Sequence, residues 1–107
     1  MPVDDVRTRL QVYLAEDDRS GHRSLGEDLL AQAHDRGMAG ATLWRGIEGF
    51  GASGGMRTAR FPDAGAALPL VLEVVDTDER VQAFLDAVVQ RLPAALVTTE
   101  PVRVRRG

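Results

Sequence analysis

The chain has 107 residues, of which 44% are hydrophobic and 27% charged, and its formal net charge is −3. This composition is typical of one soluble globular domain. It excludes a disordered tail, a fibrous repeat and a membrane protein, because no apolar run approaches the roughly 20 residues that cross a bilayer. The chain has no cysteine, which excludes disulfides and thiolate chemistry. From the length we expect a single domain over residues 1–107. Because its acidic start, from Met1 to Asp5, lacks the features of a secretory signal, we expect the protein in the cytoplasm.

The charged residues narrow the kinds of ligand that the protein can hold. The negative net charge argues against general nucleic-acid binding. All 13 basic residues are arginines, which excludes a lysine Schiff base, a lysine general base and a P-loop lysine. Any bound anion must therefore be held by arginine side chains or by backbone N–H groups.

The first predicted element is a strand over about residues 7–15, because Leu10, Val12 and Leu14 alternate with polar residues. A charged loop follows at residues 16–23.

A helix is predicted to begin at Ser24, which forms an S-x-x-E capping box with Glu27, and to end at Gly37. Its apolar face is predicted to comprise Leu25, Leu29, Leu30 and Ala33. Residues 38–45 then predict a short second strand.

Residues 46–67 are rich in glycine and alanine and predict a long excursion between strands. The nearly continuous apolar run from Leu70 to Val75 predicts the third strand, in the centre of a sheet. Along that strand Leu70, Leu72 and Val74 point to one face, while Val71, Glu73 and Val75 point to the other.

A second helix is predicted to begin with Asp76 or Thr77 as its cap and to end at Pro93. Its apolar positions, spaced three and four residues apart, are Val81, Phe84, Leu85, Val88, Val89 and Leu92. Residues 95–105 predict the last strand, in which Pro101 indicates an edge or a bulge.

The order β-α-β-β-α-β is that of the ferredoxin-like split βαβ sandwich, an α+β fold with two helices on one face of a four-stranded antiparallel sheet. The other face of the sheet has no cover within the chain. Leaving it in water would forfeit about 1.5–3 kcal/mol per large apolar side chain. We therefore predict a homo-oligomer, and a monomer with a partly apolar sheet is the alternative.

The segment from Gly40 to Gly51, GATLWRGIEGFG, carries the strongest chemical signal. A strand leads through Arg45 into a turn that holds Gly46, Gly49 and Gly51. Glycines allow close approach of the backbone to a ligand, consecutive turn N–H groups form anion-binding nests, and an arginine can bind a phosphate with two hydrogen bonds. A loop whose glycines serve only for turning is the alternative.

The string that begins at Gly49, GFGASG, also matches the G-x-G-x-x-G fingerprint of dinucleotide-binding domains. That fingerprint requires a crossover helix directly after it. Here the following residues include Pro62 and show no apolar helical stripe. We therefore reject a dinucleotide-binding fold.

The segment GATLWRGIEGFG, followed by LPLVLEVVD at 68–76, EDDR at 16–19 and LVTTE at 96–100, resembles the DUF190 (UPF0166) family. The resemblance covers nearly the whole chain, and the family is grouped with the PII-like signalling proteins. It therefore implies a ferredoxin-like homotrimer that binds an adenine nucleotide (ATP, ADP or AMP) in clefts between subunits. It also implies that residues 46–67 correspond to the T-loop, the flexible loop through which PII proteins signal.

The resemblance also implies ligand-binding residues. The T-loop base would hold phosphates through Arg45, Gly46, Glu48, Gly49, Phe50 and Gly51. The arginines that follow the last strand, Arg103 and Arg105, occupy the place of the C-terminal arginines of PII proteins. Two features depart from PII proteins: the glycine-rich segment with a phosphate-binding lysine is missing, and the loop has no tyrosine, which excludes uridylylation of the PII type.

Acidic residues near this segment are further candidates for the site. Glu16, with Asp17 and Asp18, could help to close a ligand cleft or bind a metal, although a solvated turn is the commoner interpretation. Glu48 could orient Arg45 or bind a ribose hydroxyl, or simply be exposed. We expect no catalytic residue and no resident metal or cofactor.

Three hypotheses about function follow. The first is a regulatory homotrimer that binds a small anion, an adenine nucleotide above all, and signals through residues 46–67 to a partner. The second is a small ferredoxin-like enzyme acting on a phosphorylated or acyl-phosphate substrate, in which Arg45 would stabilise the transition state. The third is an accessory protein of an ion transporter or channel, with no membrane insertion of its own.

Overall fold

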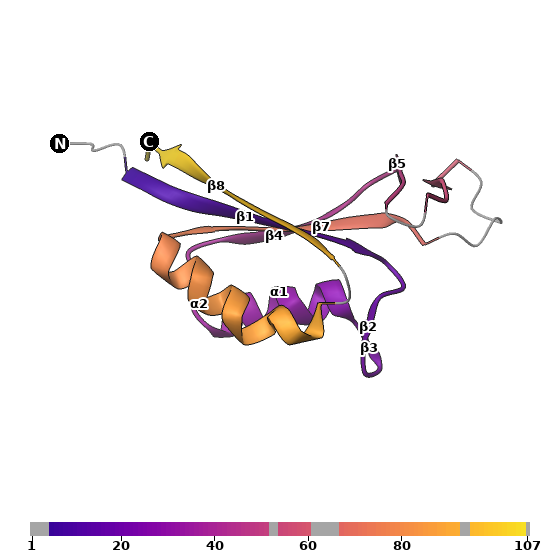
Figure 1. Cartoon of the computed structure of the whole chain (residues 1–107), viewed down its shortest axis with the longest axis horizontal. Helices are drawn as coiled ribbons and strands as arrows, with labels where there is room; N and C mark the ends of the chain where they lie inside the picture. The colour runs from indigo at the N-terminus through magenta and orange to yellow at the C-terminus, as the bar shows by residue number, and fades with distance from the viewer. Residues whose placement is uncertain (1–4, 52–53, 61–66, 93–94, 107) are drawn as a thin grey trace.

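The computed structural model describes residues 5–51, 54–60, 67–92 and 95–106. Its main sheet has four strands in the order β4-β7-β1-β8, with every neighbouring pair antiparallel. These strands are β1 (Asp5–Ala15), β4 (Ala41–Arg45), β7 (Pro69–Asp76) and β8 (Leu96–Val104). The helices α1 (Leu25–Asp35) and α2 (Asp78–Val88) both lie against one face of the sheet (Figure 1). The predicted ferredoxin-like sandwich is confirmed.

The core lies between this sheet face and the two helices. On the strands it consists of Leu10, Val12, Leu14, Leu70, Leu72 and Val74. The helices contribute Leu25, Leu29, Ala33, Val81, Phe84 and Val88. These are the faces that the alternation and the helical spacing predict, since side chains alternate along a strand and recur every three or four residues on a helix.

The helix starts follow from side-chain caps. The Ser24 hydroxyl accepts a hydrogen bond from the backbone N–H of Glu27 at 3.5 Å. Thr77, rather than Asp76, caps α2 by accepting from Arg80 N at 3.3 Å. Gly37 follows α1 with a φ of 70°, as expected of a residue that ends a helix.

The C-terminal part of α2 departs from the predicted pattern. The chain tightens into a 3₁₀-helix, η2 (Val89–Arg91). Because a 3₁₀-helix turns more per residue than an α-helix, Val89 leaves the apolar face and is 50% exposed. The prediction that Val89 packs with the core is therefore wrong. The predicted end at Pro93 lies outside the described residues.

The second strand is shorter than predicted. β4 begins at Ala41 rather than at residue 38. The N–H groups of Gly37 and Met38 instead donate to the last carbonyls of α1, those of His34 and Ala33. Residues 38–40 therefore belong to the connection that ends the helix, and only five residues are left for the strand.

Two short hairpins lie in segments that were predicted to be loops. In the charged loop β2 (Arg19–Ser20) pairs with β3 (Arg23–Ser24), and Gly21 turns between them with a φ of 63°. In the excursion β5 (Glu48–Gly49) pairs with β6 (Arg57–Thr58). Two-residue strands carry no hydrophobic alternation, so a periodicity argument cannot detect them.

The second face of the sheet is bare in the described chain (Figure 1). As predicted, Val71, Glu73 and Val75 lie on this face and are partly exposed, while the residues between them are buried. The strand register also places Leu96, Tyr13, Val71 and Trp44 side by side across all four strands, a set that we call the apolar row. Trp44 is 56% and Leu96 62% exposed, so the row presents large apolar side chains to solvent.

Candidate functional site

The excursion of residues 46–67 leaves and rejoins the sheet at the same end. β4 ends at Arg45, β7 begins at Pro69, and β1 ends beside them at Ala15. In Figure 1 the described part of the excursion, which includes β5, extends beyond the sheet at the end opposite the start of β1 and the end of β8. We call the residues where these three strands meet the excursion base: Glu16, Arg45, Gly46, Leu68 and Pro69.

Glu16 connects the two ends of the excursion. One carboxylate oxygen, Oε2, lies 3.4 Å from Arg45 Nη1, at the residue from which the excursion departs. The other, Oε1, accepts a hydrogen bond from Leu68 N at 2.8 Å, where the excursion returns. The backbone of Glu16 also donates to the carbonyl of Leu68 at 2.9 Å. The sequence marked Glu16 as a candidate for closing a ligand cleft, which stays a prediction, and its pairing with Arg45 was not predicted.

The backbone at Gly46 and Gly49 runs so close to the Pro69 ring that a side chain at either position would crowd it. A Cβ on Gly46 would lie 2.8 Å from Pro69 Cγ, and one on Gly49 would lie 3.2 Å from it. Among the described glycines, positive φ occurs only at Gly21, Gly37 and Gly54, so Gly46, Gly49 and Gly51 do not adopt the left-handed conformation that an anion-binding nest uses. Moreover, Gly46 N donates to Pro69 O at 2.8 Å, which extends the β4–β7 ladder.

Glu48 pairs with Arg60 rather than with Arg45. Its Oε1 lies 2.6 Å from Arg60 Nε, across the small β5–β6 hairpin. Of the three alternatives for Glu48, the one in which it orients Arg45 does not fit this geometry, because Glu16 is the carboxylate beside Arg45. Arg57, on the same hairpin, donates to Ala67 O at 2.9 Å.

The acidic turn after β1 is a set of anchors rather than a solvated loop. Asp17 Oδ1 lies 3.8 Å from Arg57 Nη1. Asp18 accepts from Ala15 N at 2.9 Å through its side chain and from Leu25 N at 2.8 Å through its carbonyl. In the part of the chain that the structure describes, no three His, Cys, Asp or Glu side chains gather as a metal site would require.

The excursion also presents apolar side chains to solvent. Ile47 is 77%, Phe50 71% and Met56 61% exposed. Gly51, next to Phe50, would accept a Cβ with nothing within 4 Å. Phe50 and Gly51 therefore lie away from the excursion base, in contrast to Gly46 and Gly49.

Arg103 and Arg105 lie at the other end of the molecule. Residues Asp5 and Val104 pair with each other, whereas Arg45 pairs with Leu70 near the far end of β1. Because a strand rises about 3.3 Å per residue, the two ends of the sheet are separated by roughly 30 Å. A single chain therefore does not bring the C-terminal arginines to the excursion base.

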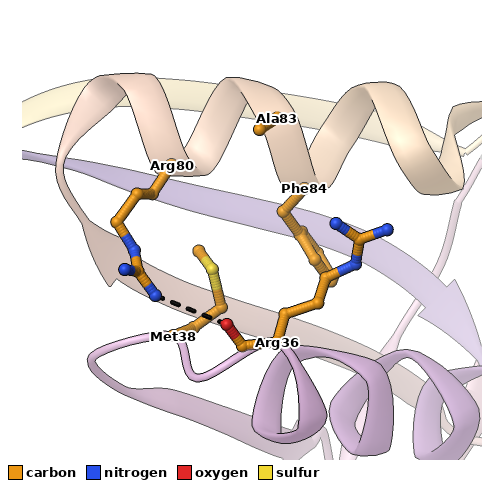
Figure 2. A pocket seen from close by; sticks show the side chains of 5 residues that line it. All are labelled: Arg36, Met38, Arg80, Ala83 and Phe84. Carbon is orange, nitrogen blue, oxygen red and sulfur yellow. Dashed lines mark hydrogen bonds between the residues drawn. The ribbon is translucent and has the colours of Figure 1, made fainter.

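A pocket lined by Arg36 and Arg80 lies between the end of α1 and the start of α2 (Figure 2). Figure 2 shows Arg80 reaching toward the α1 terminus, where its Nη2 donates to Gly37 O at 2.5 Å and to Arg36 O at 3.5 Å. Its Nε donates to Asp76 at 3.0 Å. This arginine satisfies helix-terminal carbonyls and a buried carboxylate, so the pocket is part of the helix packing rather than an anion site.

Sequence reasoning missed Leu68 and Pro69 as parts of the base. The only signal for them is a proline directly before the apolar strand, where the excursion returns. None of the helices in the described ranges has the length and apolar character needed to cross a membrane.

Comparison with known proteins gives a consistent family and fold. The model of the DUF190 family, described as Uncharacterized ACR, matches residues 7–104. A "UPF0166 protein" from Aquifex aeolicus (strain VF5) is 30% identical over 95 residues, which cover 89% of this chain and 90% of that protein.

Solved structures of CPII, a nitrogen regulatory PII-like protein from Thiomonas intermedia K12, share the fold. The form bound to ADP and bicarbonate aligns with a TM-score of 0.60 at 21% identity, covering 95% of this chain and 91% of that chain. The form bound to ADP, AMP and bicarbonate aligns with a TM-score of 0.59 at 20% identity, covering 94% and 96%. The apo form aligns with a TM-score of 0.58 at 19% identity, over the full length of both chains.

Proposed function

The chain belongs to the DUF190 (UPF0166) family, whose fold is PII-like, and from this we propose that it is a regulatory protein that binds a small anion, an adenine nucleotide, between its subunits. The observation that carries the proposal is the excursion base. There an exposed arginine, Arg45, stands where a 22-residue excursion over 46–67 leaves a rigid sheet. Proteins of this fold have been solved with ADP, AMP and bicarbonate, which supports an anionic ligand of this class.

Arg45 is the residue best placed to contact the ligand. Its side chain is 65% exposed and has one carboxylate partner at 3.4 Å. A guanidinium can form two parallel hydrogen bonds with a phosphate, and these are stronger than the single contact it makes with Glu16. The N–H of Gly46 donates to Pro69 O, so this N–H is already occupied and the proposed contact is through the Arg45 side chain.

The proposal requires more than one copy of the chain. Arg103 and Arg105 can reach the excursion base only from another subunit, since they lie at the far end of their own sheet. The apolar row on the bare face provides the reason for association, because each large apolar side chain removed from water contributes about 1.5–3 kcal/mol. We propose the homotrimer that the family resemblance implies.

Sedimentation tests the assembly. Val71 lies in the middle strand pair of the apolar row, so Val71→Asp is expected to shift the protein from trimers to single chains. The matched control is Ala87→Asp on the exposed side of α2, which should sediment as the wild type does. A wild-type protein that sediments only as single chains at micromolar concentration contradicts the proposal.

Calorimetric titration with ATP, ADP, AMP and bicarbonate tests the ligand. We expect heat with at least one adenine nucleotide and its loss in Arg45→Ala. The control is Arg36→Ala, which removes an exposed arginine at the end of α1 and should bind as the wild type does. Absence of heat with every adenine nucleotide at physiological concentration would remove the nucleotide from the proposal.

We further propose that the excursion contacts a partner protein, and that an ion transporter or channel is one candidate. The support is the exposure of Ile47, Phe50 and Met56 on an excursion that begins at the ligand site. A pull-down from membrane and soluble fractions tests this, with Phe50→Asp expected to release the partner. Capture of the same proteins by wild type and variant would contradict it.

A further inference from the structure

Every arginine between residues 45 and 60 already faces a carboxylate. Arg45 lies 3.4 Å from Glu16, Arg57 lies 3.8 Å from Asp17, and Arg60 lies 2.6 Å from Glu48. An anion that binds at this end of the sheet therefore does not meet free cations. An anion that takes the same N–H donors has to compete with the carboxylate that is already in place.

We propose that Glu16 competes with the anionic ligand for Arg45, and that this exchange loosens the excursion at its base. The inference rests on the proposed function, since it concerns the regulation of the same site. Glu16 is here a positioning residue: it contacts Arg45 and Leu68 rather than the ligand. The occupant that drives the exchange is a di- or triphosphate group, whose oxygens match the guanidinium better than a single carboxylate contact does.

The geometry of Glu16 couples the exchange to the far end of the excursion. Its two oxygens serve different groups, Oε2 the side chain of Arg45 and Oε1 the backbone N–H of Leu68. When Arg45 turns to a phosphate, Glu16 is left with an uncompensated charge beside the phosphate and is repelled from it. Its hydrogen bond with Leu68, which fixes the return of the excursion, is weakened as a result.

Asp17 adds a second exchangeable pair in the same turn. Its contact with Arg57 joins the turn after β1 to β6 inside the excursion. Because Arg57 also donates to Ala67 O at 2.9 Å, loss of this arginine to a phosphate would free a second point near the return of the excursion. Both pairs are partly exposed, so each can be displaced at a modest free-energy cost.

The decisive variant is Glu16→Gln, which removes the charge but keeps an oxygen that can accept from Leu68 N. Calorimetry at fixed ionic strength would compare ADP and inorganic pyrophosphate on wild type and variant. Because an exposed ion pair is worth about 0.2–1 kcal/mol, releasing Arg45 should tighten binding of both anions by roughly 1.4- to 5-fold. Asp86→Asn, which removes an exposed carboxylate on α2, is the matched control and should not change the affinity.

A second measurement, made on the wild type, tests whether the anion displaces Glu16 from Arg45 even where Glu16→Gln does not fold. The exchange rate of the Leu68 amide, read by NMR or by mass spectrometry, should rise when pyrophosphate is added and stay unchanged with sodium chloride at the same ionic strength. The N–H of Gly46, bonded to the main chain of Pro69, is the internal reference and should keep its protection.

The outcomes separate this inference from the proposed function. If ADP binds the wild type but Glu16→Gln binds equally or more weakly, the exchange is overturned while the nucleotide proposal stands. If ADP gives no heat but pyrophosphate binds and is tightened by Glu16→Gln, the nucleotide is wrong and the exchange stands. If neither anion binds the wild type or the variant and the Leu68 amide does not respond, both are overturned.

Discussion

The sandwich and the excursion base are held together by different forces. Between the helices and the sheet, residues such as Leu72, Val81 and Phe84 are at most 1% exposed, and stability comes from apolar burial. At the excursion base, the contacts are the Glu16–Arg45 ion pair between partly exposed side chains, main-chain hydrogen bonds, the buried Leu68 and the close approach of Gly46 to Pro69. The first region resists changes of charge and salt, whereas the second responds to both. The proposed function needs this division, because a bound ligand would have to move one part without unfolding the other.

The largest expected effect comes from making the same substitution in the sandwich and in the excursion that the base carries. Phe84→Ala empties a site that is 1% exposed, and such truncations cost about 3–5 kcal/mol of unfolding free energy. Phe50→Ala removes a side chain that is 71% exposed, and surface changes of this kind stay within about 0.5 kcal/mol. Denaturant titration of both variants measures the difference.

This pair of variants can also contradict the comparison. If Phe50→Ala destabilises the protein as much as Phe84→Ala does, then Phe50 is buried in the assembled protein and the excursion is part of its core. Repeating the titration at several protein concentrations distinguishes burial of Phe50 within its own chain from burial against another copy. Only burial against another copy makes the midpoint of the unfolding transition depend on protein concentration.

The next effect concerns Asp76, the one charged side chain that is buried among the residues that the structure describes. Burial by itself raises the pKa of Asp76, but hydrogen bonds from Ala39 N and Thr77 N and the Arg80 guanidinium outweigh it and lower the pKa below its usual value. Asp76 is 3% exposed, and hydrogen bonds to a charged group are worth about 1.5–3 kcal/mol. Asp76→Asn should lower the unfolding free energy at neutral pH by about that amount.

The pH dependence of this loss has a definite sign. A carboxyl group whose pKa is lowered by folding stabilises the protein above the ordinary carboxyl pKa, near 4, and loses this contribution as the pH falls through its folded value. The difference between wild type and Asp76→Asn should therefore shrink in acid. A difference that stays constant from pH 7 to pH 2 would show that the charge of Asp76 contributes nothing.

At the excursion base the expected effects are smaller and steric. A Cβ on Gly46 would lie 2.8 Å from Pro69 Cγ, and overpacking of this kind costs about 1–3 kcal/mol. Gly51→Ala is the control, since nothing lies within 4 Å of its Cβ position. Equal unfolding free energies for Gly46→Ala and Gly51→Ala would show that the base yields without cost and that Pro69 does not restrain it.

The sandwich was more predictable from the sequence than the excursion base. The strands and helices of the sandwich were predictable because burial imposes a period: Leu10, Val12 and Leu14 alternate, and Val81, Phe84 and Val88 recur along one helix face. Where the period breaks, as at Val89, the prediction failed. The cause is a tightening of the helix that no residue type in that stretch signals.

The excursion base was only partly predictable. Arg45 and Glu16 were both identified as candidates from their positions at strand ends, but their pairing depends on two strands that the sheet brings side by side. The glycines pointed to phosphate binding, whereas their close partner is Pro69, about 20 residues further along the chain. Contacts between segments that are distant in sequence leave no local pattern, so the sequence indicated Arg45, Glu16 and the glycines but neither Leu68 and Pro69 nor the contacts.

The smallest expected effect is also the most direct measure of the force that holds the excursion. Glu48 and Arg60 lie 2.6 Å apart across the β5–β6 hairpin, with Arg60 76% exposed. A double-mutant cycle of Glu48→Gln and Arg60→Gln should give a coupling of at most about 1 kcal/mol. This coupling should fall further at 1 M salt, where charges are screened within about 3 Å. The Phe84→Ala loss should be insensitive to the same salt, apart from a general shift of both proteins. A coupling well above 1 kcal/mol that survives high salt would mean that the β5–β6 hairpin is desolvated in the assembled protein. The excursion would then be stabilised by burial, as the core is, and the contrast between the two regions would be wrong.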